Sequence, residues 1–151
     1  MKLPKYDFIA NKEKNYFQFI SDGPKGRILK VVEFTKLEDE NVFNLGFGDW
    51  DEANKKINDI VVTNNGDSIK VLATVASTIY DFTRKNPKAI IFITGSTEVR
   101  TRLYRMGITN NLEEIKKDFL VFGVKKDWSY ELVIIGEDYQ AFFIARKIIA
   151  I

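Results

Sequence analysis

The sequence predicts an α+β domain in which a largely antiparallel, curved sheet carries two to three helices packed on one face. The prediction depends on strand-like segments that precede the first helical pattern and on a later alternation of helix and strand. A ribonuclease-H-like α/β domain is the alternative, since a three-strand, helix, strand, helix order also occurs there. The 151 residues contain no internal repeat and no linker-like stretch, so a single domain is expected over 1–151.

Five segments before the first helix have the composition of strands. They are rich in β-branched and aromatic side chains, which fit a pleated, half-buried surface. Turn residues at 22–26 predict a hairpin between the second and third segments, and a turn at 38–41 leads into the fourth. The predicted strands cover residues 6–10, 16–21, 27–37, 42–47 and 60–63.

A helical period starts after a turn at 64–67, where Asp67 is the predicted N-cap. The helix is expected to run to about Lys85, where an Asn-Pro pair stops it. Spacings of three and four positions predict its inward residues, which are Ile69, Leu72, Ala73, Ala76, Ile79 and Tyr80. The continuous apolar run at 89–94 then predicts a strand buried on both faces and central in the sheet.

A second helix is predicted after this strand, with Thr97 as its cap and Gly107 as its C-terminal stop. Its predicted inward residues are Val99, Leu103 and Met106.

A short third helix is predicted over 112–118, behind the candidate caps Asn110 and Asn111. Strands are expected at 119–124 and 141–145. The second of these is a short apolar run, so a helix is its alternative.

Composition excludes several kinds of chemistry. The chain has no His and no Cys, so an imidazole base, a thiolate nucleophile, a disulfide and the usual zinc sites are excluded, and no cofactor or metal is predicted. The 23 Lys and Arg against 21 acidic residues give a net charge of +2, which does not support nucleic acid as a partner. The absence of a long apolar run predicts a cytoplasmic protein without membrane contact. An exposed sheet edge offers a route to a homodimer.

The junction between the strand at 89–94 and the second helix is the strongest candidate for a binding site. Free backbone N–H groups at a helix N-terminus favour anions, and the nearby hydroxyls add donors. Three arginines can make bidentate contacts to phosphate or carboxylate. The predicted ligand-binding residues are Gly95, Ser96, Thr97, Arg100, Arg102 and Arg105.

Arg100 adds a further argument, because it falls in the first helical turn. The helix dipole disfavours a cation there unless an anion compensates. The alternative is structural. In that case Glu98 pairs with Arg102, Thr97 only caps the helix, and Arg100 and Arg105 bind carboxylates of the protein itself.

A second constellation is acidic. Two or three carboxylates could bind Mg²⁺, as a nuclease requires, although Asp beside Gly or Asn is also what turns and caps use. The candidates are Asp49, Asp51, Glu52, Asp59 and Asp67.

Two functions follow from these two sites. The first is a noncatalytic binding or regulatory module, whose junction contacts an anionic group on a protein partner, a nucleotide or nucleic acid. The alternative is a metal-dependent phosphodiesterase or nuclease. No motif selects a catalytic residue.

Three phrases of the sequence carry a resemblance. They are GPKG at 23–26, NLGFGD at 44–49 with NGDSIKVLATV at 65–75, and GSTEVRTRLYR at 95–105. In their order and spacing the chain resembles a bacterial family of domains of unknown function, and its middle third is similar to phage proteins. The resemblance implies no activity and no catalytic residues. It implies only that the central helix, strand and helix are the signature of the family.

Overall fold

The computed structural model describes residues 3–38, 41–58 and 63–147, which form two helices and one nine-stranded sheet. The helices are α1 (Ser68–Lys85) and α2 (Glu98–Asp118). The strands are β1 (Ile9–Ala10), β2 (Tyr16–Gly23), β3 (Gly26–Lys36), β4 (Val42–Asp51), β5 (Lys56–Asn58), β6 (Ile90–Thr94), β7 (Phe119–Val124), β8 (Tyr130–Leu132) and β9 (Ala141–Arg146).

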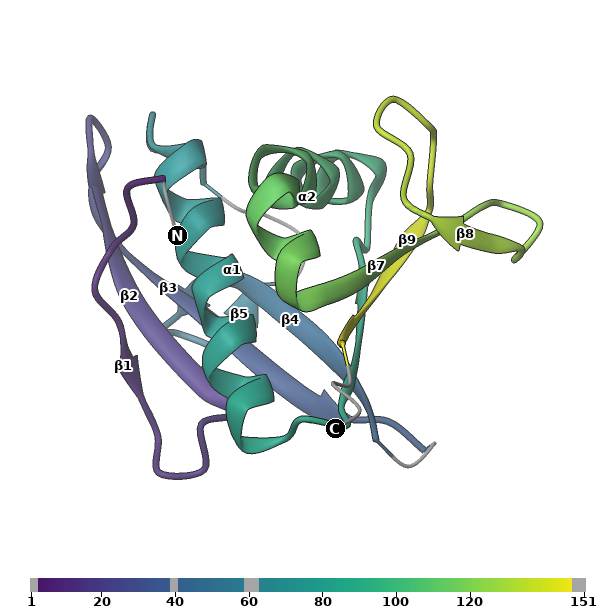
Figure 1. Ribbon diagram of the computed structural model, residues 1–151. Coiled ribbons are helices and arrows are strands. Elements are labelled where there is room, and N and C mark those ends of the chain that lie inside the picture. Colours follow the sequence, from purple (N-terminus) through teal and green to yellow (C-terminus); the bar gives the residue numbers. More distant parts are fainter. Residues whose placement is uncertain (1–2, 39–40, 59–62, 148–151) are drawn as a thin grey trace.

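The sheet confirms the predicted α+β class. Its order is β1-β2-β3-β4-β6-β9-β7-β8, with β5 paired to β4. Among the described strands only β4 and β6 pair in parallel, so the α/β alternative is not supported. Figure 1 shows both helices in front of the curved sheet, on one face.

Most predicted strands are confirmed within a few residues, and the apolar run at 141–145 is a strand, as β9. The segment at 6–10 is a strand only in β1, and no local pattern predicted β5 or β8. The strand predicted at 60–63 lies, except for Thr63, outside the described residues, as does the middle of the turn at 38–41.

Helix α1 has nearly the predicted bounds, but its N-cap differs in chemistry. Asp67 occupies the cap position without making a side-chain cap bond. Its Oδ2 instead accepts hydrogen bonds from Tyr6 Oη (2.6 Å) and Ser21 Oγ (2.5 Å). The residue therefore ties α1 to the N-terminal segment and to β2. Ile69, predicted to face inward, is exposed.

The prediction that α2 stops at Gly107 is wrong, because the helix continues through it to Asp118. A Cβ at Gly107 would lie 3.2 Å from Leu72 Cβ, so this glycine lets α2 approach α1 closely. Asn111, predicted as a cap, lies inside the helix and donates from Nδ2 to Gly107 O (2.7 Å). The separate third helix is accordingly the last part of α2.

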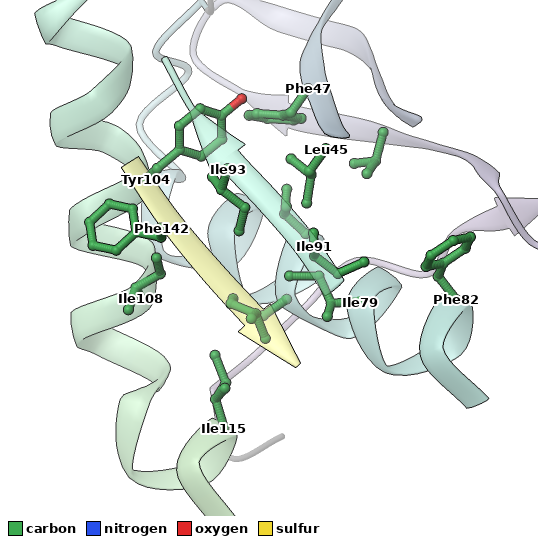
Figure 2. Packing of buried hydrophobic residues seen from close by; sticks show 14 of the residues in the cluster. Leu45, Phe47, Ile79, Phe82, Ile91, Ile93, Tyr104, Ile108, Ile115 and Phe142 are labelled. Carbon is green, nitrogen blue, oxygen red and sulfur yellow. The ribbon is translucent and has the colours of Figure 1, made fainter. Parts of the chain in front are cut away.

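The predicted inward face of α2 is wrong for Val99 and Met106, whereas Leu103 is partly buried and packs against the core cluster. The buried residues of this helix are Arg100, Tyr104, Gly107, Ile108, Asn111, Leu112 and Ile115. Val99 is 70% exposed and Met106 is 38% exposed. Figure 2 shows Tyr104 reaching from α2 towards Phe47 on β4. One cluster of buried residues joins the sheet to both helices.

Candidate functional site

A hollow of about 610 Å³ lies at the junction of β6 and α2, where the sequence predicted a binding site. We call it the junction hollow. Its lining includes five of the six predicted ligand-binding residues, Gly95, Ser96, Thr97, Arg102 and Arg105, together with Glu98, Thr101, Lys126 and Asp138.

The junction is shaped by one close contact and one cap. A Cβ at Gly95 would lie 2.4 Å from Thr101 N, so only glycine fits where the strand turns under the first helical turn. Thr97 Oγ1 accepts a hydrogen bond from Arg100 N (3.2 Å), and Thr97 O accepts from Thr101 N (3.0 Å). The predicted capping role of Thr97 is confirmed.

Arg105 reaches across the hollow. Its Nη2 donates to Asp138 Oδ1 (2.7 Å) and to Tyr139 O (3.1 Å). Lys126 Nζ lies 3.8 Å from Asp138 Oδ2, so two cations share one acid. Arg105 Nε is buried and has no hydrogen-bond partner among the described residues.

Arg102 is an exposed cation of the hollow, as is Lys126. Within the described ranges it forms no ion pair, so the expected pair with Glu98 is absent. Arg102, Arg105 and Lys126 face the hollow against Glu98 and Asp138. The lining therefore carries one net positive charge.

Arg100 does not join the other two arginines. It is 5% exposed, and its guanidinium donates to Phe47 O, Asn58 O (3.4 Å) and Tyr104 Oη (3.3 Å). At 3.6 residues per turn, Arg102 and Arg105 are neighbours at i, i+3 and share the junction hollow, whereas Arg100 does not line it. The structural alternative is wrong for Arg100, which binds carbonyl oxygens and a hydroxyl, and it is confirmed for Arg105, which binds the carboxylate of Asp138.

The hydroxyl beside Arg100 provides a pH-dependent test of this packing. Burial raises the pKa of Tyr104 above about 10, although the neighbouring guanidinium lowers it. The folded state thus holds this proton more tightly than the unfolded state, and the stabilisation is complete below about pH 10 and lost at higher pH. We expect the free energy of unfolding, from urea titrations, to fall above that pH. Tyr104→Phe should make this fall smaller, and an unchanged fall would contradict the assignment.

The acidic residues do not form a metal site in the described part of the chain, which contains no group of three acidic side chains that could hold a metal ion. Asp49 pairs with Lys30, and Asp51 accepts from Asn54 N (3.1 Å) within a turn. Asp59 lies outside the described residues. The structural role anticipated for Asp51 is therefore the one observed.

Sequence reasoning missed Lys30, whose side chain is 1% exposed. Its Nζ donates to Asp49 Oδ1 (2.5 Å) and Thr63 O (2.9 Å). The sequence did contain a signal that Lys30 is buried. Side chains at alternate positions of a strand share one face, and Lys30 alternates with the buried Val32 and Phe34 on β3. It also stands opposite Asp49 in the β3–β4 register.

Comparisons with known proteins identify a family for the chain, but they do not indicate an activity. A family model described as a family of unknown function, DUF6934, matches residues 2–147. No curated protein and no solved structure matches the chain. Neither helix in the described part of the chain is long and apolar enough to cross a membrane. The bacterial source, the similarity to phage proteins and the homodimer stay predictions. The predicted resemblance is confirmed, and the chain belongs to DUF6934, a family of unknown function.

Proposed function

We propose that the protein is a noncatalytic binding module, and that the junction hollow takes a phosphate group of its ligand. The observation that carries the proposal is the convergence of Arg102, Arg105 and Lys126 on one hollow, whose described lining contains two acids. Arginine presents a planar fork that matches phosphate oxygens, and lysine adds a point charge. The N-terminus of α2 opens on the same hollow and favours negative charge.

The arrangement of the cations supports a ligand more than an internal network. Asp138 is 70% exposed and is shared by Arg105 and Lys126. Exposed ion pairs contribute little to stability, so a phosphate can displace this carboxylate at small cost. The buried Nε of Arg105 is a donor that lacks a partner in the described chain. A multiply charged phosphate offers more acceptors than Asp138 does.

We expect inorganic pyrophosphate and ATP to bind with measurable heat in isothermal titration calorimetry. The variant Arg102→Gln/Lys126→Gln removes two exposed cations and should weaken binding at least about tenfold, because hydrogen bonds to charged groups contribute about 1.5–3 kcal/mol each. Lys36→Gln/Lys88→Gln is the matched control. It removes two exposed cations at the end of β3 and before β6, outside the hollow.

Equal weakening in both double variants would show a general charge effect and contradict the proposal. So would the absence of heat with both probes. If single-stranded DNA binds more tightly than ATP and its affinity falls steeply with salt, the ligand is nucleic acid, and a mononucleotide-sized site is rejected.

A further inference from the structure

A second hollow, distinct from the junction hollow, lies where α1 and α2 begin. It has a volume of about 330 Å³ and shares only Arg102 with the junction hollow among their described lining residues. Ligand pockets run from roughly 300 to 1,000 Å³, so it is large enough for a small molecule. We call it the α1–α2 cleft, and the lining residues that matter here are Lys30, Val71, Val99, Arg100, Leu103 and Met106.

The wall of the cleft is apolar where a surface helix is normally polar. Val99 and Met106 are exposed on α2, while Leu103 is partly buried, packs against the core and also lines the cleft. Arg100 is buried in place of Val99 and Met106, which explains why the apolar spacing of α2 predicted these two inward residues wrongly. Single exposed apolar residues need no explanation, but three in one cleft form an apolar floor for a ligand.

The inner end of the cleft holds a buried ammonium group with spare donor capacity. Lys30 is almost fully buried and lines the cleft. An ammonium group has three donors. Two of them are used by Asp49 and Thr63 O, and the third has no partner in the described ranges.

Arg100 adds a second buried cation to the lining. Its partners in the described chain are two carbonyl oxygens and one hydroxyl, with no carboxylate. A buried charge without a counterion is costly, so a negative group beside it is stabilising.

The charges that the described residues bring to the cleft do not cancel. Among them, three cations, Lys30, Arg100 and Arg102, compare with two acids, Asp49 beside Lys30 and Asp67 in the lining. Asp67 already accepts from Tyr6 and Ser21. One net positive charge at an apolar cleft matches a ligand with a single negative charge.

We propose that the α1–α2 cleft binds a small organic anion, a carboxylate with a short apolar chain. Its carboxylate accepts hydrogen bonds from Lys30 and Arg100 at the inner end. Its chain lies on Val99, Leu103 and Met106 at the mouth. This site differs from the phosphate site of the proposed function and does not depend on it.

Hexanoate is the probe, and its binding to the full chain is followed by methyl NMR spectra. We expect saturable shifts of the Val71, Val99 and Leu103 methyl signals. Hexan-1-ol lacks the charge and acetate lacks the chain, so each should bind at least about tenfold more weakly than hexanoate. Comparable binding of hexan-1-ol would overturn the role of the cations, and shifts confined to other methyl groups would overturn the site.

Variants at Val99 test the site without disturbing the core, because this side chain is exposed. Val99→Asp places a negative charge at the mouth, and Val99→Asn introduces a side chain of the same shape without the charge. Because like charges repel, Val99→Asp should weaken hexanoate binding about tenfold more than Val99→Asn does. Equal affinities of the two variants would overturn the proposal. Lys126→Gln should leave hexanoate binding unchanged, so a failure here and a failure of the phosphate site are distinguishable.

Discussion

Replacing Lys30 by Met is expected to destabilise the protein by about 3–5 kcal/mol, because it leaves Asp49 without its partner in a mostly buried position. The Lys30 and Asp49 side chains are 1% and 15% exposed, and the two residues face each other across β3 and β4. The substitution also leaves Thr63 O without its hydrogen bond from Nζ. Urea denaturation followed by tryptophan fluorescence measures the loss.

Two controls separate charge from packing. Lys36→Met changes an exposed lysine at the end of the same strand and should stay within about 0.5 kcal/mol of the parent. Lys30→Met/Asp49→Asn removes the unpaired charge but keeps an acceptor for Thr63 N, so it should recover much of the loss. If the double variant is as unstable as Lys30→Met, the cost comes from packing and the electrostatic account is wrong.

Phe82→Ala is the second large effect, expected to cost about 3–5 kcal/mol through lost burial and an unfilled cavity. Phe82 is 1% exposed and lies near the end of α1. Its ring stacks on Phe34 at 4.3 Å between centroids and meets the edge of Phe43 at 4.9 Å. The ring thus joins α1 to two strands of the sheet. Figure 2 shows Phe82 at one end of the buried cluster.

The control for Phe82→Ala is Ile69→Ala, which removes an exposed apolar side chain from the same helix. It should change the free energy of unfolding by less than about 0.5 kcal/mol. Thermal denaturation and urea titration should both show a larger loss of stability for Phe82→Ala than for Ile69→Ala. Because Ala has the highest helix propensity, a loss in either variant reflects lost packing, and a similar loss in both would contradict the role given to the aromatic contact.

The sequence predicted the parts of the fold whose signals are local. β3 has a long run of strand-like composition, and α1 has a long apolar pattern of period 3.6. The bounds of both elements were predicted nearly to the residue. β5 and β8 are three residues each and exist because a neighbouring strand pairs with them, which no local pattern records. Gly107 has the residue type of a helix stop, but packing against Leu72 determines its role.

The candidate sites divide in the same way. The hollow at the end of β6 could be predicted, since a strand that ends in small residues before a capped helix is a local feature. The pairing of Arg102 with Arg105 at the junction hollow follows from their i, i+3 spacing and could have been predicted from it. The role of Lys30 depends on which strands lie side by side, although its phase in β3 hinted at burial.

The position of β9 has a consequence for synthesis of the protein. This strand is the last of those that the structure describes, yet it lies inside the sheet, with β6 on one side and β7 on the other. While the chain is still growing, β6 and β7 have no common neighbour to join them. The sheet therefore cannot become continuous on the ribosome until residue 146 has emerged, and until then each half exposes an unpaired edge to chaperones and to other nascent chains.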